Sequence, residues 1–363
     1  MDLTPFLLAW RTVALRDRQV VDALVHPSHA GPSPALAEAL ARWVGTYYWS
    51  DEPDGRHLIL TRPMRLPRER WLLNGALFLA TLVTTTWAGA ALRGVIDREH
   101  ALAFFTAGWR AWQAGLPFSL PLLAILLSHE LGHYVTGRRY QLDVSPPFFI
   151  PVPSAPYLPF IGTMGAFIRL RTVLSDRRQL LDVGIAGPIA GFVVALPVLW
   201  LGLRLSHPLP FQDGQGLALS VYGLDIRLGN CAVTWLLRRL GAPGTGGLAL
   251  HPMAVAGWVG MFVTMLNLLP ISQLDGGHIL YAALPRLHRR FALTVWLALL
   301  ALGWWTWIGW VVWAVVVLGL SRGQLGHPPV LDNQRPLPPS RRWLAWAALA
   351  LFLLTFMPAP FAN

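Results

Sequence analysis

Apolar segments about as long as a lipid bilayer is thick recur along this chain of 363 residues. A helix needs about 20 consecutive apolar residues to cross the hydrocarbon core, because each residue adds about 1.5 Å. We expect 291–320 to form a helical hairpin broken near Gly303 and Gly309. The chain is therefore predicted to be an all-α polytopic membrane protein with about seven transmembrane helices. The expected spans are 71–92, 117–136, 180–203, 252–274, 291–305, 306–320 and 343–357.

Charged side chains are too scarce for a soluble protein of this size. Only 13% of the residues are charged and 54% are hydrophobic, whereas soluble domains carry about 25% charged residues. The single cysteine excludes an intramolecular disulfide scaffold. All 29 basic residues are arginines spread along the chain rather than gathered in a stripe with aromatic residues. We therefore expect membrane lipids to surround this protein, and we expect it not to bind nucleic acid.

The positions of the arginines predict the orientation of the chain. If residues 1–70 lie in the cytoplasm and successive spans alternate, 22 arginines fall on the cytoplasmic side and 7 on the other side. Cytoplasmic loops carry the excess of positive charge in membrane proteins. We expect an integral, multi-pass protein of a bacterial cytoplasmic membrane. Its parts are a small cytoplasmic region (1–70), a core (71–320), and a cytoplasmic loop with a last span (321–363).

The first 70 residues differ from the rest because they lack a long apolar segment. A helix-like stretch covers 35–44, and two strands are expected at 47–49 and 57–61, around the turn Pro53-Asp54-Gly55. We interpret this region as a small cytoplasmic subdomain.

The second apolar segment ends in a histidine–glutamate motif. His129, Glu130 and His133 form H-E-x-x-H within 117–136. On a helix, positions i and i+4 lie on the same face one turn apart, so both imidazoles can bind one zinc ion. Glu130 lies about 100° around the helix, close to the metal but outside its ligand set. An unpaired Glu inside a span is costly, which favours a metal site over a merely polar helix end.

A catalytic zinc site usually has three protein ligands and one open position, so a third ligand is needed. The segment 252–274 contains no charged residue and is followed at once by Asp275. By the predicted topology, this end reaches the same side of the membrane as the two histidines. Pro270 frees a backbone carbonyl and the two glycines after Asp275 loosen the helix end. His278 is an alternative third ligand, ranked second because it should lie nearer to water.

The two motifs together resemble the site-2 protease family of intramembrane zinc metalloproteases. H-E-x-x-H lies in one span, and N-x-x-P-x-x-x-L-D-G follows from Asn267 in a later one. The similarity covers about residues 70–320 and is greatest to the branch found in cyanobacteria and chloroplasts. The resemblance implies that His129, His133 and Asp275 bind Zn²⁺ and that Glu130 is the general base. It also implies that Asn267 helps to bind the substrate or its oxyanion.

The same resemblance implies an endopeptidase that hydrolyses peptide bonds in transmembrane segments of other membrane proteins. The segment between residues 203 and 252 is too short for the PDZ domain that some members carry there. The alternative is a membrane protein that binds a metal without proteolysis, either a transporter or an inactive scaffold. The missing internal repeat argues against a transporter, and the complete ligand set with Glu130 argues against a scaffold.

A proline-rich segment between the second and third spans is expected to meet the substrate. Four prolines between residues 146 and 153 forbid a helix there, and residues 160–169 are expected to form a strand. The strand is predicted to belong to a short membrane-associated β-hairpin. Within it, Gly162, Thr163, Met164 and Gly165 would pair with the unwound substrate by strand addition. The alternative is a hairpin that dips into lipid and has only a structural role.

Closely spaced glycines mark the third span. Gly184, Gly187 and Gly191 provide the G-x-x-x-G type of spacing that lets helices approach closely. We expect these glycines to pack near the active site. A helix loosened by Pro188 that gates substrate entry is the less favoured interpretation. Further along, residues 231–239 are expected to form an amphipathic helix at the membrane interface.

Overall fold

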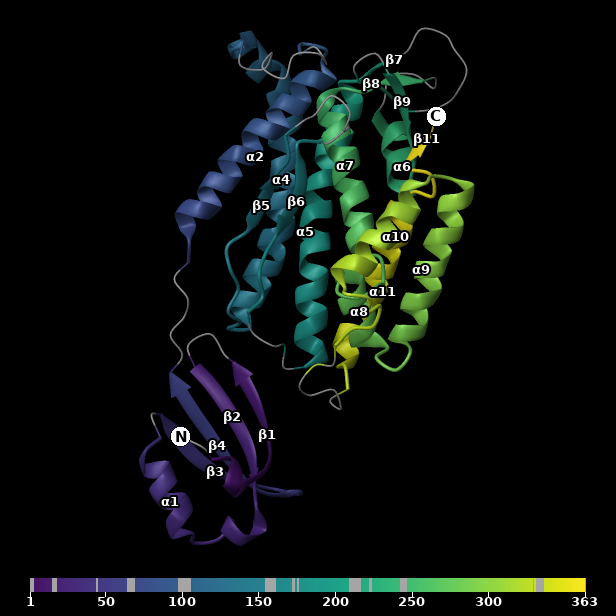
Figure 1. Cartoon of the computed structure of the whole chain (residues 1–363). Coiled ribbons are helices and arrows are strands. Elements are labelled where there is room, and N and C mark those ends of the chain that lie inside the picture. Colours follow the sequence, from purple (N-terminus) through teal and green to yellow (C-terminus); the bar gives the residue numbers. More distant parts are fainter. Residues whose placement is uncertain are drawn as a thin grey trace.

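The structure is a computed structural model, and it consists mostly of helices with a small sheet domain beyond one end of the helical bundle (Figure 1). It describes the chain except residues 1–2, 15–17, 44, 64–68, 97–105, 154–160, 172–173, 175, 209–216, 222–223, 242–246, 329, 331–335 and 363. The helices are α1 (Pro34–Ala41), α2 (Trp71–Leu92), α4 (Trp109–Arg139), α5 (Arg177–Arg204), α6 (Ala232–Gly241), α7 (Pro252–Asn267), α8 (Asp275–Ala283), α9 (His288–Trp305), α10 (Gly309–Leu320) and α11 (Pro339–Thr355). The strands are β1 (Leu7–Ala14), β2 (Arg18–Val25), β3 (Thr46–Glu52), β4 (Gly55–Pro63), β5 (Phe148–Pro151), β6 (Thr163–Phe167), β7 (His207–Pro208), β8 (Leu217–Val221), β9 (Leu224–Leu228), β10 (Leu248–Ala249) and β11 (Phe361–Ala362).

The N-terminal region is a four-stranded antiparallel sheet covered by α1, with strand order β1-β2-β4-β3. Leu58 and Leu60 alternate along β4, and Leu36 and Leu40 lie one turn apart on α1, so that all four are buried against each other. The sequence predicted the helix and two of these strands but missed β1 and β2. The all-α description is therefore wrong for this region. It also omits a five-stranded sheet, ordered β11-β9-β8-β10-β7, at the end of the helical bundle away from the N-terminal sheet (Figure 1).

Three helices among the described residues are long and apolar enough to cross a membrane. They are α2, α4 and α5, with 22, 31 and 28 residues. The other expected spans correspond to shorter or less apolar helices, so the structure does not establish all seven. The predicted hairpin in 291–320 is divided into α9 and α10 at residues 306–308, between the two glycines named above.

The expected span 252–274 ends seven residues early, at Asn267. Pro270 has no N–H to donate, and in an α-helix its ring would clash with the backbone carbonyl of the preceding turn. Ser272 then adopts a left-handed backbone conformation with φ of 51°. The chain makes a tight turn and restarts as α8 at Asp275. A Cβ atom on Gly276 would lie 2.0 Å from the carbonyl oxygen of Leu268, so the turn requires a glycine there.

The helices α4, α5 and α7 lie side by side in the bundle (Figure 1). Their shared core contains the fully buried side chains of Phe118, Leu122, Leu199 and Trp258. Burying each such side chain stabilises the fold by about 1.5–3 kcal/mol. This packing holds the HExxH end of α4 and the end of α7 in one place.

Strands β5 and β6 pair antiparallel beside α2, with Phe149 opposite Ala166. The Asn74 side chain of α2 donates a hydrogen bond to the Pro147 carbonyl at 2.8 Å, and Thr84 donates one to the Gly162 carbonyl at 2.6 Å. Asn74 is buried within a span, where an unpaired amide would be costly. These bonds fix β5 and β6 to α2. The residues between them, 154–160, lie outside the described part of the chain.

Candidate active site

Three ligand-type side chains meet inside the helical bundle. The Nε2 atoms of His129 and His133 are 3.1 Å apart. Oδ2 of Asp275 lies 3.3 Å from the first and 3.4 Å from the second. Both histidines come from α4, and Asp275 comes from the first turn of α8, 142 residues further along the chain. The structure thus brings together the two motifs that the sequence singled out.

The spacing of these three atoms fits a tetrahedral zinc site. Zinc binds imidazole nitrogen at about 2.0–2.1 Å, so neighbouring ligand atoms in a tetrahedral site are about 3.4 Å apart. Each of the three measured separations is close to this value. Two imidazoles and one carboxylate also match the ligand types of catalytic zinc, which has three protein ligands and one open position. Geometry and donor chemistry therefore both suit Zn²⁺.

A backbone carbonyl determines which ring nitrogen of His133 carries the proton. Nδ1 of His133 lies 2.8 Å from the carbonyl oxygen of Val183 on α5. Because a carbonyl only accepts hydrogen bonds, Nδ1 carries the proton and Nε2 keeps its lone pair for a metal. No sequence signal could have identified this partner, since every residue has a backbone carbonyl. Only the packing of α5 against α4 selects Val183.

The glycines of α5 allow this close packing. A Cβ atom on Gly187 would lie 2.0 Å from Nε2 of His133, and one on Gly191 would lie 3.2 Å from Cβ of His129. From the other side, a Cβ on Gly132 of α4 would lie 2.4 Å from the Ala186 carbonyl oxygen. The prediction that the glycines pack near the active site is therefore confirmed. Glycine at these positions leaves room for the imidazoles and for an ion between them.

Asp275 is placed by the start of α8. The carboxylate lies in the first turn of that helix, where the unpaired backbone N–H groups and the helix dipole favour negative charge. The turn before it, with Pro270 and Ser272, directs the helix start toward α4. His278, the alternative third ligand, is three residues further on. Its Nδ1 lies 2.7 Å from Nε2 of His327 instead of in the cluster.

Glu130 is buried beside the cluster, with 6% of its surface exposed. The backbone N–H of Ile168, just after the end of β6, lies near this carboxylate. This proximity connects the candidate general base to the strand that was expected to bind substrate. An ionised carboxylate has lone pairs that can accept a proton.

Asn267 also reaches the cluster. Its Nδ2 atom lies 3.2 Å from Nε2 of His129, at the last residue of α7. An amide at this point can donate hydrogen bonds toward anything that occupies the space between the ligands. The structure thus brings Asn267 to the cluster, and its role in binding substrate stays a prediction.

The four predicted substrate-binding residues of the loop have different surroundings. Gly162 and Thr163 are buried, and the Thr163 hydroxyl donates to the Ile150 carbonyl at 2.9 Å. Gly162 has φ of 85°, and a Cβ atom there would lie 2.4 Å from the Thr84 carbonyl oxygen of α2. The side chain of Met164 is 68% exposed. Gly162 and Thr163 therefore hold the strand in place, while Met164 is accessible.

Comparisons with known proteins agree with this arrangement. Residues 117–303 match the family described as "Peptidase family M50", and this range includes most of α4 and all of α8. The chain is 30% identical over 248 residues to "Probable zinc metalloprotease EGY1, chloroplastic" of Oryza sativa subsp. japonica, covering 68% of this chain and 41% of that protein. It is 30% identical over 296 residues to "Probable zinc metalloprotease EGY2, chloroplastic" of Arabidopsis thaliana, covering 80% and 50%.

These relatives are longer than the matched part, since the chain spans about half of their length or less. No solved structure matches the chain. The family match covers 187 of the 363 residues and includes His129, Glu130, His133, Asn267 and Asp275. The resemblance seen in the two motifs is thereby confirmed, and the chain belongs to peptidase family M50.

Proposed function

We propose that this protein is a zinc endopeptidase that hydrolyses peptide bonds within transmembrane segments of other membrane proteins. The observation that carries the proposal is the cluster of His129, His133 and Asp275 with Glu130 beside it, buried in a bundle of apolar helices. Its histidines lie on α4, which is long and apolar enough to cross a membrane. A cluster on a membrane-spanning helix suits substrates that lie in the membrane.

Zn²⁺ is the metal we propose, held by His129, His133 and Asp275. The relatives named above are called zinc metalloproteases, and the ligand geometry fits that ion. When bound, zinc polarises a peptide carbonyl and lowers the pKa of water. The protein's own part is to hold His133 in one tautomer through the Val183 carbonyl and to keep the surroundings of the ligands apolar.

Glu130 is the proposed general base and acid. It lies next to His129 in the sequence and does not belong to the ligand cluster. In this role it takes a proton from the attacking water and passes it to the nitrogen of the leaving amine. Asn267, with its amide at the cluster, would hold the substrate carbonyl or the oxyanion that forms from it.

Strand β6 is the proposed docking edge for the substrate. A helical substrate must be unwound first, because its carbonyls are occupied by intrahelical hydrogen bonds. Among the described residues, β6 pairs with one strand, β5, which leaves its other edge for strand addition by residues 162–165. The end of β6 leads to Ile168, whose backbone N–H lies near Glu130. A strand added there would run toward the general base.

The proposed location is a bacterial cytoplasmic membrane, with residues 1–70 in the cytoplasm. The excess of arginine on that side in the expected topology supports this orientation, with 22 arginines against 7. It places the HExxH end of α4 at the cytoplasmic side. Cleavage would then occur near the cytoplasmic end of the substrate's transmembrane segment.

The decisive experiment replaces the proposed base without removing a metal ligand. Purified Glu130→Gln protein should retain one zinc per chain and lose cleavage of a single-span model substrate by about 10²–10⁴-fold. Glu38→Gln is the matched control, because Glu38 pairs with Arg42 on the exposed surface of α1. An active Glu130→Gln enzyme would contradict the proposal. A wild-type protein that binds zinc but cleaves no membrane substrate would support the non-proteolytic alternative.

The docking edge can be tested separately. Met164→Pro removes one backbone N–H from β6, and Met164→Ala shortens the exposed side chain while it keeps the N–H. If strand addition aligns the substrate, Met164→Pro should reduce turnover of the model substrate strongly and Met164→Ala only slightly, with zinc content unchanged in both. Equal turnover in the proline variant and the wild type would reject strand addition at this edge.

A further inference from the structure

The loop that follows α10 makes hydrogen bonds on both sides of Asp275. The backbone N–H of Ser272, three residues before Asp275, donates to the Leu325 carbonyl at 3.0 Å. The ring of His278, three residues after Asp275, lies with its Nδ1 atom 2.7 Å from Nε2 of His327. One short piece of chain therefore holds the segment before and the segment after the third candidate zinc ligand.

The direction of the hydrogen bond between the two rings follows from the neighbour of His327. Nδ1 of His327 is bonded to the carbonyl oxygen of Pro328, and a carbonyl only accepts hydrogen bonds. In the neutral ring of His327, Nδ1 therefore carries the proton and Nε2 accepts. Nδ1 of His278 is then the donor of the bond between the rings.

Two further contacts hold His327 itself. Its backbone N–H donates to Nδ1 of His288, at the start of α9, at 3.4 Å. Its ring stacks on the ring of Tyr281 in α8, with the ring centroids 4.6 Å apart. Both neighbours are buried. A ring held on several sides has little freedom to follow its partner, so His327 can fix the position of His278.

Helix α8, which carries Asp275, is short and starts without a side-chain cap. It has nine residues, and the residue before it is Leu274, whose apolar side chain accepts no hydrogen bond. In proteins, most of the stability of such short helices comes from tertiary packing. The position of Asp275 therefore depends on what α8 and the turn before it contact.

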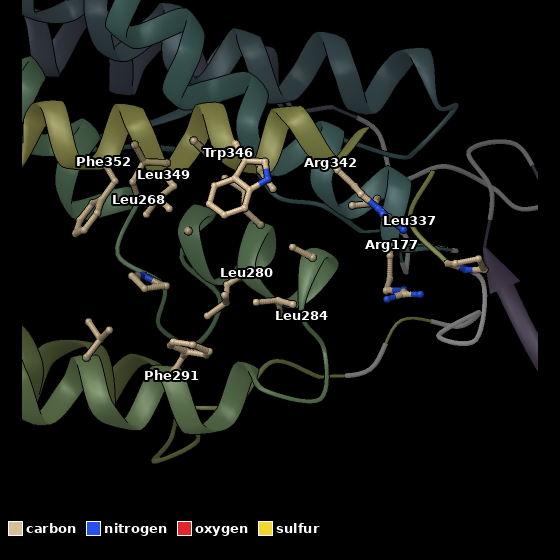
Figure 2. Close-up of a pocket in the computed structure, with 18 residues that line it drawn as sticks. Arg177, Leu268, Leu280, Leu284, Phe291, Leu337, Arg342, Trp346, Leu349 and Phe352 are labelled. Atoms are coloured by element: carbon tan, nitrogen blue, oxygen red, sulfur yellow. The ribbon is translucent and has the colours of Figure 1, made fainter. Parts of the chain in front are cut away.

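One face of α8 borders a cavity (Figure 2). The cavity has a volume of about 770 Å³ and lies between α8, α9 and α11. Leu280 and Leu284 of α8 line it, and so does Pro270 in the turn before the helix. Side chains beside a cavity lack contact with atoms across the gap, so this face contributes less to holding α8.

Another face of α8 packs closely against α5. A Cβ atom on Gly184 would lie 3.1 Å from Cβ of His278 and 3.5 Å from the carbonyl oxygen of Asp275. His278 thus contacts α5 through its Cβ atom and the loop after α10 through its ring. These two contacts of one side chain hold the first turn of α8 from both directions.

We propose that His327 is a positioning residue for the zinc site, which acts through its hydrogen bond with His278 to hold Asp275 in the ligand cluster. The proposal rests on the zinc site of the proposed function but not on the proteolysis. Loss of an outer partner of a metal ligand costs about 10–100-fold in metal affinity. Because His327 reaches Asp275 through α8 rather than directly, we expect an effect of about tenfold.

The test measures the zinc affinity of the purified full-length protein by competition with a chelator. His327→Leu removes the acceptor of the His278 N–H and should weaken zinc binding about tenfold. His327→Gln keeps an acceptor oxygen and should restore most of this loss. Gln324→Leu is the matched control, because Gln324 has an exposed side chain in the same loop. The control should bind zinc as the wild type does.

A second pair of variants tests the same bond with the loop unchanged. The side-chain amide of Asn has an N–H donor near the position of Nδ1 in histidine. His278→Asn should therefore bind zinc nearly as tightly as the wild type, whereas His278→Leu should lose about as much affinity as His327→Leu. Equal affinities of His278→Asn and His278→Leu would overturn the proposal.

A double-mutant cycle tests whether His327 acts through Asp275. When Asp275→Ala has removed the ligand, adding His327→Leu should cause no further loss of zinc affinity, because the two changes affect the same interaction. A general structural role of His327 would weaken zinc binding by the same factor with and without Asp275. That additive result would overturn the proposal, and so would equal zinc affinities of His327→Leu and the wild type.

The same measurements separate this proposal from the proposed function. A wild-type protein that binds no zinc would contradict both the zinc site and the role of His327. A protein that shows the expected changes in zinc affinity but cleaves no membrane substrate would support the role of His327 and contradict only the proteolysis.

Discussion

Two clusters of histidine and carboxylate occur in this protein, and they differ in what the histidine nitrogens face. In the helical bundle, His129, His133 and Asp275 lie with their ligand atoms within 4.8 Å of one another, and in the N-terminal sheet Glu52, Asp54 and His57 do the same. By residue type and spacing alone, both are candidates for a metal.

The partners of the two histidine ring nitrogens distinguish the two clusters. In the sheet, Nδ1 of His57 lies 2.7 Å from Asp22 and Nε2 lies 3.1 Å from Asp54. Carboxylates on both sides favour a doubly protonated ring, which has no lone pair for a metal. In the bundle, one nitrogen of His133 is taken by a neutral carbonyl and the other stays available. A carbonyl partner on one ring nitrogen leaves the other nitrogen able to bind a metal. Two carboxylate partners instead favour a protonated histidine in an ion pair.

The largest effect is expected on zinc binding, when one histidine of each cluster is replaced in turn. His133→Ala removes one of three ligands and should abolish stoichiometric zinc binding and cleavage, because removing even an outer partner of a ligand costs 10–100-fold in metal affinity. His57→Ala should leave both unchanged. Metal analysis of the purified variants measures this. If His57→Ala lost zinc to the same extent, the distinction between the clusters would be wrong.

An intermediate effect is expected from the packing around the buried cluster. Gly187→Ala places a methyl group 2.0 Å from Nε2 of His133, so the ring must move. We expect a fall of about 10–100-fold in zinc affinity, similar to the loss of an outer partner. Gly75→Ala on α2 is the control, since a Cβ atom there meets nothing within 4 Å. Competition with a zinc chelator measures both, and equal affinities would contradict the packing argument.

The smallest effect concerns the pH dependence of the sheet. The hydrogen bond and the charge of Asp22 raise the pKa of His57 above its usual value of 6.5, against the opposing effect of burial. Protonated His57 therefore stabilises the sheet fully below about pH 6.5, and this stabilisation is lost as the pH rises through the folded-state pKa. His57→Gln should weaken the sheet more at pH 6 than at about pH 9.

Hydrogen exchange of the β2 and β4 amides in the full chain, corrected for intrinsic rates, measures this difference. His26→Gln is the control, because His26 is exposed and is hydrogen-bonded to Ser28 rather than to a carboxylate. A His57→Gln effect that grows with rising pH would reverse the assigned sign.

The helical part of the site was predictable because its signals are local. The i, i+4 spacing of His129 and His133 determines that they share a helix face, and the helix is long and apolar enough to span a membrane. Asp275 could be named because it follows an uncharged segment, and the break at residues 306–308 falls between the two glycines that predicted it. The four-stranded sheet was only partly predictable, because apolar and polar residues do not alternate strictly along β1 and β2, and β2 also pairs with β4, which lies much further along the chain.

The membrane character, the two motifs and the candidate ligands could be inferred from the sequence, since hydropathy and helical spacing are properties of neighbouring residues. Three features became visible only in the folded chain: α7 ends at Asn267, His278 contacts His327, and the Val183 carbonyl contacts His133. It also revealed the cavity between α8, α9 and α11. These features depend on which backbone and side-chain atoms meet across the bundle, and contacts between segments far apart leave no fixed spacing in the chain.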